Sequence, residues 1–481
     1  MSEKRSSTLV RRRTKIVATI GPATASIDML RKLIAAGMDV ARLNFAHGSY
    51  EQHAASIQAI RQAAVACGKP VAILQDLPGP KVRTGKLTSE SVMLEDGATL
   101  VLTTADTVGD AARISISLPS LPKAVKTGST IYLDDGSISL EVLGASADEI
   151  QCRVLVGGKL GWEKGINVPG VRLDVPALTE QDIKHLDFGL LQGVDLVALS
   201  FVRDAEDIRK LKKLLDEKGA NVPVIAKIEK HEAMDSIDEI LEVADGAMVA
   251  RGDLGIEIPI AEVPLAQKKI IRKCNHLGKP VIVATQMLES MVEYSRPTRA
   301  EATDVANAIF DGADALMLSE ETAIGRYPVE AVKMMSQIAV QTETALPYET
   351  ILREMGLDPA PNLDDAISYA ACRTAHQLNA SAIIAFTTSG STARRVSRYR
   401  PRVPILGMTS SEATLRQLNL SWGVYPILAP QCTSLDDLLQ SGVDIAQTAG
   451  LIQKGDLVVM VAGVPIGVAG TTNMLRVQKV E

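Results

Sequence analysis

The feature that most constrains the fold is a short apolar segment that recurs eight times between residues 15 and 321. Each segment is rich in Val, Ile, Leu or Ala and ends in polar residues, and helical patterns such as Ser26–Ala36 and Ala261–Leu277 lie between them. Nearly continuous apolar runs are typical of parallel strands covered on both faces. Eight strand–helix units in succession therefore predict a closed α/β architecture, a (β/α)8 TIM barrel. The eight segments are Lys15–Gly21, Met38–Ala46, Val71–Leu77, Asp195–Val202, Pro223–Glu229, Gly246–Asp253, Pro280–Met287 and Ala315–Glu321.

The stretch between the third and fourth segments, Lys86–Asn167, has a different texture. Short runs such as Thr99–Thr103, Thr130–Leu133 and Ile138–Val142 are bounded by Gly, Asp and Ser, which indicates antiparallel β-structure. We expect a small inserted β-barrel domain over residues 86–167 that forms a lid on the top of the larger barrel. The catalytic barrel would then occupy residues 14–85 and 168–342, after an N-terminal tail over residues 1–13.

The remainder of the chain, residues 343–481, returns to alternating helix and strand. Asn362–Leu378 has a helical pattern and Ser381–Thr387 is a strand-like run, with further alternation to the C-terminus. The sequence therefore predicts a C-terminal open α/β domain.

Charge and cysteine content narrow the class of protein. A net charge of −6 argues against general nucleic-acid binding, which needs a basic face. The five cysteines lie far apart without C-x-x-C spacing, so neither a disulfide framework nor a zinc site is expected. The basic N-terminus around Arg11–Arg13 lacks the apolar core of a signal peptide, and no apolar run is long enough to span a membrane. We expect a cytoplasmic protein that binds no membrane.

The segment Pro223–Glu229 carries two charges in an otherwise apolar run. Side chains alternate along a strand, so Lys227 and Glu229 point to the same side. Buried charges are costly unless they are paired or bound to a charged group. The simplest interpretation is a structural ion pair between Lys227 and Glu229 at the end of the strand, since charged groups in unusual surroundings also occur in purely structural networks.

The ends of the other segments favour a site instead. Barrel active sites lie at the C-terminal ends of the strands, and these ends combine carboxylates suited to a metal with cations suited to an anionic substrate. Glu229 and Asp253, on neighbouring strands, could place two hard oxygens on one Mg²⁺. If a short helix begins at Arg251, its free N–H groups could bind a carboxylate. The polar residues at these ends are Arg42, Asn44, Asp76, Arg83, Lys227, Glu229, Arg251, Asp253, Thr285, Ser319 and Glu321.

Several ordered motifs resemble those of the pyruvate kinase family, in particular a bacterial-type subgroup. The resemblance covers essentially the whole chain after the tail, and several long motifs in order are far more specific than any single glycine pattern. The motifs are Met38–Gly48 (MDVARLNFAHG), Ile225–Glu229 (IAKIE), Met248–Gly255 (MVARGDLG), Ala284–Met287 (ATQM), Arg296–Glu301 (RPTRAE) and Met317–Ala323 (MLSEETA).

This resemblance implies transfer of the phosphoryl group of phosphoenolpyruvate to ADP, giving pyruvate and ATP, as the last step of glycolysis in an allosteric homotetramer. The implied catalytic residues are Lys227, Arg42, Thr285 and Ser319, with the proton donor to the enolate left open. The implied substrate-binding residues are Arg42, Lys227, Ala250, Arg251, Gly252, Asp253 and Thr285. Mg²⁺ or Mn²⁺ would be held by Glu229 and Asp253, and a second Mg²⁺ would arrive with the nucleotide. ADP would face Pro22, Asn44, His47, Arg83 and Lys164.

The sequence departs from the family pattern at the site of the monovalent cation. Many pyruvate kinases hold K⁺ with an asparagine, a serine, an aspartate and a threonine, and the matching residues here are Asn44, Ala46, Asp76 and Leu77. Two oxygen ligands are therefore missing, and Lys81 stands where a glutamate is familiar. An ammonium there could supply the charge of K⁺. We expect activity without K⁺; the alternative is that Lys81 is merely a solvated side chain.

A loop after Ser381–Thr387 resembles the site at which this family holds an activating phosphorylated effector. Hydroxyls and backbone N–H groups at a helix start suit a phosphate, although an ordinary capped helix is the alternative. Enzymes activated by fructose-1,6-bisphosphate commonly carry an arginine in a late loop, and Gly463–Gly470 has none. An effector with one phosphate, such as a sugar monophosphate or AMP, is therefore favoured. The loop residues are Thr387, Thr388, Ser389, Gly390, Ser391 and Thr392.

Two other functions are compatible with parts of the sequence. A barrel enzyme that acts on phosphoenolpyruvate or pyruvate without a nucleotide would not need Arg83, His47 and Lys164. A catalytically silent sensor of sugar phosphates would not need the intact set of Lys227 and its neighbours. Both alternatives explain less of the sequence than a kinase does.

Overall fold

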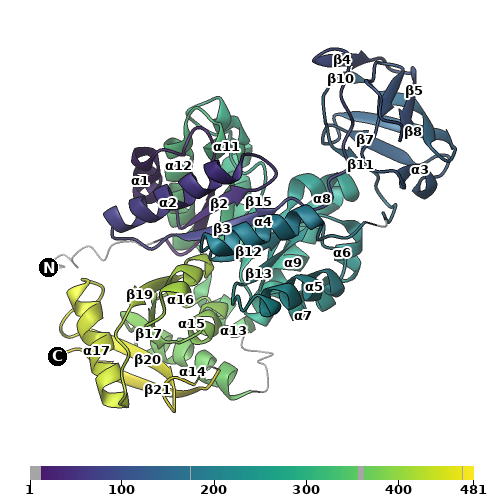
Figure 1. Ribbon diagram of the computed structural model, residues 1–481. Coiled ribbons are helices and arrows are strands. Elements are labelled where there is room, and N and C mark those ends of the chain that lie inside the picture. The colour runs from purple at the N-terminus through teal and green to yellow at the C-terminus, as the bar shows by residue number, and fades with distance from the viewer. Residues whose placement is uncertain (1–11, 174, 356–361, 469) are drawn as a thin grey trace.

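The structure is a computed structural model that describes residues 12–173, 175–355, 362–468 and 470–481 (Figure 1). Residues 1–11 of the expected N-terminal tail and Ala469 of the late loop lie outside the described residues. All five cysteines are free thiols. In the part of the chain that is described, no helix has the length and apolar character needed to cross a bilayer.

The eight predicted segments form a closed barrel of parallel strands, each segment containing one strand. Around the barrel the strands follow the order β1-β16-β15-β14-β13-β12-β3-β2. This confirms the predicted TIM barrel, which forms because apolar runs pair edge to edge while helices cover their outer face. The strands are β1 Lys15–Thr19, β2 Val40–Asn44, β3 Ala72–Leu77, β12 Leu196–Leu199, β13 Val224–Ile228, β14 Gly246–Ala250, β15 Val281–Ala284 and β16 Ala315–Leu318.

Long helices surround the barrel, and several begin with an unambiguous local signal. Ser49, Thr179 and Thr298 each form a capping box with the residue three positions later, which satisfies backbone N–H groups at the helix start. The helices that cover the barrel are α1 Ile27–Ala36, α2 Tyr50–Ala66, α4 Glu180–Leu191, α5 Ala205–Glu217, α7 Ile237–Val243, α9 Val263–Leu277, α10 Arg299–Asp311 and α12 Pro328–Thr344. Short helical pieces follow some strands at the top: α6 His231–Asp235, α8 Arg251–Glu257, η1 Ile260–Glu262, η2 Glu289–Val292 and α11 Glu320–Ala323.

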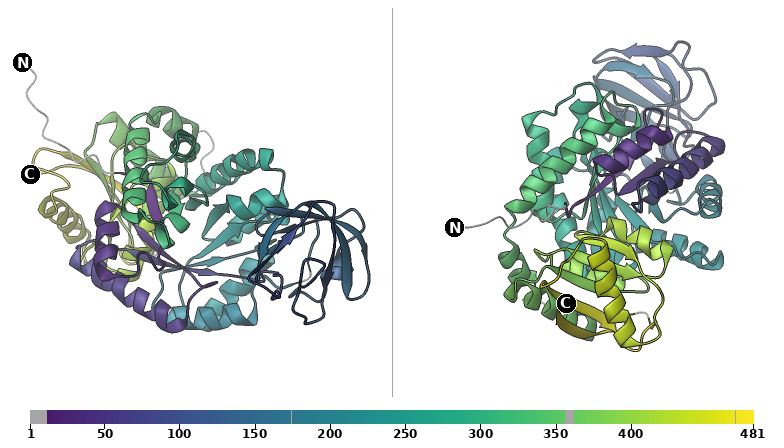
Figure 2. Two further views of the ribbon diagram at one scale, coloured as in Figure 1. Left: turned by 90° about the horizontal axis from the view of Figure 1, so that it is seen from above. Right: turned by 90° about the vertical axis from the view of Figure 1, so that its left-hand side faces the viewer.

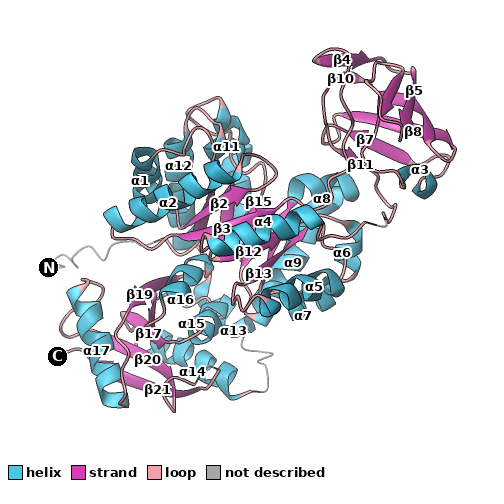
Figure 3. Ribbon diagram, viewed as in Figure 1, coloured by secondary structure: helices cyan, strands magenta, loops and turns pink. Residues whose placement is uncertain are grey.

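The insert, residues 86–167, stands away from the barrel (Figure 1) and consists almost entirely of strands (Figure 3). Its ladders follow the orders β11-β7-β8-β9-β5-β6 and β10-β4. Pairing is antiparallel as expected, except that β5 and β6 are parallel. The elements are β4 Ser91–Leu94, β5 Thr99–Thr103, β6 Arg113–Ser115, α3 Leu121–Ala124, β7 Thr130–Leu133, β8 Ile138–Ala145, β9 Glu149–Val156, β10 Gly158–Gly161 and β11 Ile166–Asn167.

The C-terminal domain, from α13 onward, is an open sheet in the order β19-β18-β17-β20-β21. The first four strands are parallel and β21 is antiparallel to β20, which agrees with the predicted open α/β domain. Its elements are α13 Tyr348–Met355, α14 Leu363–Gln377, β17 Ala382–Phe386, α15 Ser391–Arg398, β18 Ile405–Thr409, α16 Glu412–Gln417, η3 Leu418–Leu420, β19 Val424–Leu428, α17 Leu435–Thr448, β20 Leu457–Gly463 and β21 Thr472–Lys479.

The C-terminal domain closes the bottom of the barrel, at the end opposite the insert (Figure 2). Leu420 of η3 belongs to the same buried cluster as barrel-interior side chains such as Val17 and Val40. The barrel interior is therefore a packed core that the C-terminal domain completes, and the open end of the barrel is the one that faces the insert.

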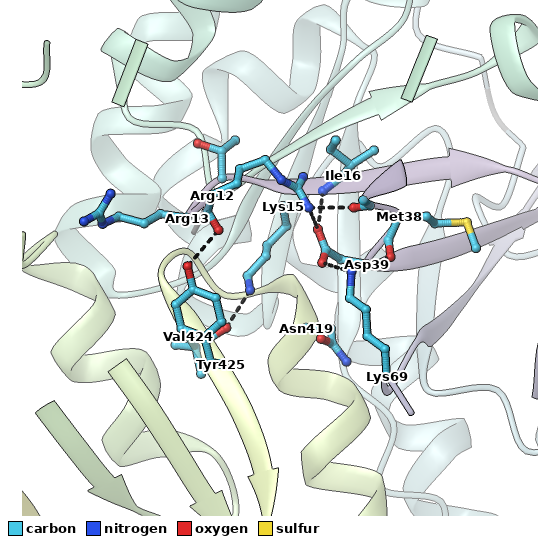
Figure 4. Close-up of polar contacts among 12 residues, drawn as sticks. Arg12, Arg13, Lys15, Ile16, Met38, Asp39, Lys69, Asn419, Val424 and Tyr425 are labelled. Atoms are coloured by element: carbon cyan, nitrogen blue, oxygen red, sulfur yellow. Dashed lines mark hydrogen bonds and ion pairs between the residues drawn. The ribbon is translucent and has the colours of Figure 1, made fainter. Parts of the chain in front are cut away.

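An ionic network around Asp39 joins the same two parts (Figure 4). Asp39 Oδ2 lies 2.7 Å from Arg12 Nη2, its Oδ1 lies 3.0 Å from Lys69 Nζ, and Oδ2 also accepts a hydrogen bond from the Ile16 amide. Burial alone would raise the pKa of Asp39, but the three nearby cations Arg12, Lys69 and Lys15 outweigh it and hold the pKa far below its usual range.

Lys15 carries this network into the C-terminal domain. Its ammonium donates to the backbone oxygen of Val424, and the Tyr425 hydroxyl donates to the backbone oxygen of Arg12 (Figure 4). Burial lowers the pKa of Lys15 to about 8 despite the attraction of Asp39. Asp39 is therefore the carboxylate that makes a buried lysine tolerable at this interface.

Replacing Asp39 with Asn should destabilise the fold strongly, because Arg12 and Lys15 would keep their charges in a buried place without their carboxylate. Removing one partner of a buried pair costs about 3–5 kcal/mol. The measurement is the shift of the urea unfolding midpoint. Glu141→Gln is the control, since its exposed pair with Arg153 (3.9 Å) should be worth less than about 1 kcal/mol. Equal midpoints for the two variants would contradict the assigned role of Asp39.

Candidate active site

Lys227 lies at the centre of a buried charged network at the top of the barrel. Its ammonium is 2.7 Å from Glu229 Oε1, 3.3 Å from Asp76 Oδ1 and 2.7 Å from Ser200 Oγ. Burial alone would lower the pKa of Lys227, but Asp76 and Glu229 outweigh it and raise the pKa above its usual value. Lys227 is therefore a permanent cation at the carboxyl ends of the strands, and the pattern of β13 does place it beside Glu229.

Arg42 extends this network along the top of β2. Its Nε donates to Asp76 Oδ2 at 2.7 Å, and its Nη1 donates to Thr19 Oγ1 at 3.0 Å. Burial would raise the pKa of Asp76, but Lys227 and Arg42 lower it, so this carboxylate stays ionised between two cations. Asp76 thereby fixes the position of both positive charges that could meet an anionic substrate.

Glu229 and Asp253 bring two carboxyl groups to one place. Glu229 is almost fully buried, and its Oε2 accepts a hydrogen bond from the Phe201 amide at 2.8 Å. Burial and the neighbouring Glu229 raise the pKa of Asp253, while Lys227 and Lys81 act in the opposite direction. A divalent cation would relieve the repulsion between the two carboxylates, so this pair of hard oxygens fits such an ion.

The strand β14 ends earlier than its predicted segment. It stops at Ala250, and α8 begins at Arg251, so Asp253 lies in the first turn of a short helix and not on a strand. This is the helix start that the Arg-Gly-Asp sequence suggested. The Gly252 amide donates to Thr285 Oγ1 at 2.9 Å, and Thr285 Oγ1 donates to the Ala284 carbonyl at 2.6 Å.

Arg251 itself has a positioning role in the structure. Its Nη1 pairs with Asp304 at 2.7 Å, its Nη2 donates to the Thr285 carbonyl at 2.7 Å, and its Nε donates to the Ala284 carbonyl at 3.3 Å. Thr285 and Gln286 that follow β15 have positive φ values of 70° and 54°. Such backbone is strained for residues with a Cβ, and Arg251 helps to hold it.

Ser319 follows β16 and is held by a buried carboxylate. The Ser319 amide donates to Glu321 Oε2 at 2.6 Å, and the Leu288 amide donates to Glu321 Oε1 at 3.0 Å. Burial raises the pKa of Glu321 although these amides act to lower it. Glu321 therefore ties together the loops after β15 and β16, which carry the two hydroxyls of Thr285 and Ser319.

Of the five residues expected to face the nucleotide, two lie beside the insert. Arg83 Nη1 donates to the Glu163 carbonyl at 2.9 Å, and Lys164 Nζ pairs with Asp134 at 2.9 Å. Pro22 is exposed after β1, and Asn44 Oδ1 accepts from the Ala46 amide at 3.1 Å.

His47 connects the barrel side of this group to the insert side. Burial, Arg83, Lys81 and Arg42 all lower the pKa of His47, in that order of size, so the imidazole lies among cations and stays neutral. A cluster of positive charge between the barrel top and the insert suits a polyphosphate.

Lys81 bridges the barrel and the insert. Its Nζ lies 3.6 Å from Asp135 Oδ1, and its side chain lies against Gly165, where an added Cβ would come within 2.9 Å of Lys81 Cε. Its charge also acts on both Asp253 and His47. Lys81 is therefore half-buried beside the candidate site and is not a fully solvated surface side chain.

The loop before α15 lacks the side-chain cap expected of an ordinary helix start. Gly390 is the N-cap residue, with a φ of 85°, and no side chain caps the helix. Thr387 Oγ1 is buried without a partner in the described part of the chain. Thr392 Oγ1 lies 2.9 Å from Thr472 Oγ1, and the Thr388 carbonyl accepts from Thr414 Oγ1 at 2.9 Å. Ser389 and Ser391 are the other two hydroxyl residues of the loop. The contacts of Thr392 with Thr472 and of Thr388 with Thr414 hold the loop to the neighbouring segments.

Sequence reasoning missed two hydroxyl residues, Ser200 and Thr19. Ser200 accepts from Lys227, and Thr19 accepts from Arg42 while donating to the Leu318 carbonyl at 2.9 Å. The available signal for Ser200 was its place near the C-terminal end of an apolar segment, as it was for Thr285. Neither residue carries a charge, so neither stood out in an apolar run.

Several known proteins resemble this chain in sequence and fold. A family model described as "Pyruvate kinase, barrel domain" matches residues 11–332, and one described as "Pyruvate kinase, alpha/beta domain" matches residues 365–478. The chain is 51% identical to a pyruvate kinase of Geobacillus stearothermophilus over 97% of this chain and 80% of that protein. It is 48% identical to one of Clostridium acetobutylicum over 98% and 100%. A crystal structure of a pyruvate kinase from Cryptosporidium parvum has a TM-score of 0.93 at 39% identity, with 98% of this chain and 96% of that chain covered.

The carboxylate pair predicts direct binding of a divalent cation. Asp253→Asn should weaken Mn²⁺ binding by at least about tenfold, because loss of a ligand should cost no less than loss of a residue that supports one. Electron paramagnetic resonance of free Mn²⁺ measures the affinity. Asp135→Asn, which removes a nearby exposed carboxylate, should leave it within about twofold. Unchanged Mn²⁺ affinity in Asp253→Asn would exclude this residue from the metal site.

Proposed function

The chain belongs to the pyruvate kinase family and is therefore an enzyme that transfers a phosphoryl group; on this premise we propose how its residues divide the work between phosphoenolpyruvate and ADP. The observation that carries the proposal is the buried network of Lys227, Arg42, Asp76 and Glu229 at the open end of the barrel. Phosphoryl transfer needs positioning and neutralisation of charge more than covalent help, and this network supplies fixed charges of both signs.

Lys227 and Arg42 act on the phosphoryl group in this proposal. Both are held by Asp76, so their positive charges stay in place without the cost of ordering flexible side chains during the reaction. Lys227 contacts the transferring group and Arg42 binds its oxygens. Because the raised pKa of Lys227 keeps it protonated, it stabilises charge and does not serve as a base.

Glu229 and Asp253 hold the divalent cation, which we propose to be Mg²⁺ or Mn²⁺. When bound there, such an ion would neutralise charge on the phosphate and on the substrate carboxylate. The helix start at Ala250, Arg251 and Gly252 orients the carboxylate through its backbone, while the Arg251 side chain holds the strained turn at Thr285. Thr285 and Ser319 line the face where the enolate takes its proton, through a donor that we leave unassigned.

Pro22, Asn44, His47, Arg83 and Lys164 form the ADP side of the site in this proposal. Support comes from the shared effect of Arg83, Lys81 and Arg42 on His47, which indicates that these cations lie close together. An enzyme that uses no nucleotide would not need this cluster of positive charge. A catalytically silent sensor would not need the intact Lys227 network.

Lys81 acts as an internal substitute for K⁺. Leu77 is fully buried and apolar, and both oxygens of Asp76 already face cations, so the residues that match the K⁺ site offer few free ligands. The Lys81 ammonium lies near enough to affect Asp253 and His47. The Lys81 ammonium would thus supply, beside the nucleotide, the positive charge that a bound K⁺ would otherwise supply.

An assay of pyruvate formation from phosphoenolpyruvate and ADP with Mg²⁺ tests both proposals together. Turnover in buffer with Na⁺ as the only monovalent cation should equal turnover with added K⁺. A large stimulation by K⁺ would keep the enzymatic function and overturn the role of Lys81. The absence of turnover in either buffer, even with sugar phosphates or AMP added, would overturn the function itself.

Lys227→Ala should lower turnover by about a thousandfold or more and leave the affinity for phosphoenolpyruvate largely intact. The reason is that the contact of Lys227 with the moving phosphoryl group strengthens in the transition state. Steady-state kinetics give kcat and KM, and calorimetry gives the affinity. Lys268→Ala, which removes an exposed lysine paired with Asp311, is the control. A rise in KM alone would show that Lys227 only binds substrate.

The loop Thr387–Thr392 binds an activator with one phosphate group in this proposal. The uncapped start of α15 and the unpartnered hydroxyl of Thr387 support it. A sugar monophosphate or AMP should lower the apparent KM for phosphoenolpyruvate, and Ser391→Ala should reduce this response. Strong activation by micromolar fructose-1,6-bisphosphate would contradict it. The homotetramer is carried over from the family, and sedimentation at the mass of one chain would contradict that part.

A further inference from the structure

A small pocket lies at the bottom of the barrel, far from the site described above, between the barrel and the C-terminal domain. The barrel contributes the end of α9 with Gly278 and Lys279, and Asp314 before β16. The C-terminal domain contributes the arginines on and after α15, together with Ser421. The pocket is therefore lined by two separate parts of the chain, residues 275–314 and residues 394–421.

Two arginines in this pocket are buried and only partly used. Arg398 and Arg400 are 7% and 6% exposed. Arg398 Nη1 donates to Asp365 Oδ1 at 2.7 Å. Arg400 Nη2 is shared between Asn275 Oδ1 at 2.6 Å, the Gly312 carbonyl and Asp314 Oδ2 at 3.0 Å.

Their remaining donors lack acceptors. Nε and Nη2 of Arg398, and Nε and Nη1 of Arg400, are buried and have no hydrogen-bond partner within the described part of the chain. A guanidinium has five N–H donors and does not lose its proton in proteins, so these groups cannot be made apolar. Each buried donor without a partner destabilises the folded protein, because the donor has lost its hydrogen bond to water. The geometry therefore calls for an acceptor between the two side chains.

The charge of the pocket indicates what kind of acceptor it takes. Arg394, Arg398, Arg400 and Lys279 line it, against the single lining carboxylate of Asp314. Asp365 pairs with Arg398, and Asp245, which attracts Arg394, is itself paired with Lys212 at 2.8 Å. Counting all of these groups, five cations face three carboxylates. Water could accept hydrogen bonds from the free N–H groups but would leave the excess of positive charge. An anion would accept the same hydrogen bonds and also neutralise that charge.

We propose that this pocket binds a phosphate group, either inorganic phosphate or the phosphate of a small monoester, and that the bound phosphate fastens α15 to the barrel. Guanidinium groups match phosphate oxygens with paired, charge-assisted hydrogen bonds. The pocket lies at the C-terminal end of α15 and the loop Thr387–Thr392 lies at its start, and Arg394 contacts both because its Nη2 donates to the Ser389 carbonyl at 3.0 Å. The proposal rests on the free donors of Arg398 and Arg400, so it stands whether or not that loop binds an effector.

The first experiment measures binding of inorganic phosphate to the full chain by calorimetry, with Mg²⁺ and phosphoenolpyruvate saturating the active site. Arg398→Gln should weaken phosphate binding by about tenfold or more, as expected for a lost charged hydrogen bond. Arg395→Gln is the matched control, since Arg395 lies on the same helix and pairs with Asp364 at 3.3 Å without lining the pocket. It should retain wild-type affinity.

A second variant covers the case in which Arg398→Gln does not fold. Ser421→Asp places a carboxylate in the pocket, where it would take the place of the ligand and should abolish phosphate binding while keeping the fold. The loop variant Ser391→Ala should keep phosphate binding, which separates this pocket from the loop. Glycerol phosphate, tested in parallel, distinguishes the sources: tighter binding than inorganic phosphate identifies a monoester, and weaker binding identifies the free ion.

Two results would overturn the proposal. One is failure of the wild-type chain to bind either phosphate probe, because the pocket would then hold only water. The other is phosphate binding that survives unchanged in Arg398→Gln or, where that variant is unfolded, in Ser421→Asp.

Discussion

The attraction between Asp76 and the two cations Arg42 and Lys227 organises the open end of the barrel. Three charged side chains from strands β2, β3 and β13 meet in a nearly dry place, where each would be costly alone. The closed barrel makes their meeting possible, because parallel strands bring the ends of distant segments to one rim. Ser200 accepts from Lys227 and Thr19 accepts from Arg42, and Glu229 completes the network. The charges of this network are thus held in position by the protein itself.

The two ends of the barrel differ in what closes them. At the bottom, Leu420 of the C-terminal domain packs into the barrel interior, and the Asp39 network surrounds this plug with buried ion pairs. At the top, the insert makes few contacts of this kind, and Lys81 reaches Asp135 across a distance of 3.6 Å. A firmly packed bottom and a lightly joined top indicate that the C-terminal domain moves with the barrel, whereas the insert has more freedom to move relative to it.

Much of this arrangement was predictable because apolar runs and polar strand ends are local signals. Each of the eight segments contains a strand, and α1, α9, α14 and β17 lie within a few residues of the predicted positions. The site residues Lys227, Glu229 and Arg42 were identified for the same reason: a charge inside an apolar run must have a purpose or a partner. Ser200 and Thr19 were missed because burying a hydroxyl in an apolar run is far less unfavourable than burying a charge, so neither residue stood out. Asp253 was placed at the end of a strand segment, but the chain turns into α8 after Ala250, at the helix start considered for Arg251.

The sequence by itself determined the barrel, its order of strands along the chain and the residue types at its rim, since periodicity and charge placement are properties of short segments. Only the tertiary structure decided which charges pair. The guanidinium of Arg251, for example, pairs with Asp304 and holds the turn at Thr285, which the sequence did not indicate. Arg398 and Arg400 lie close together in a basic stretch of the sequence, and the packing of α15 against the barrel buries both and leaves donors without acceptors. The physical reason is that the energy of a charge depends on its solvent exposure and its neighbours, and these come from segments that lie far apart in the chain.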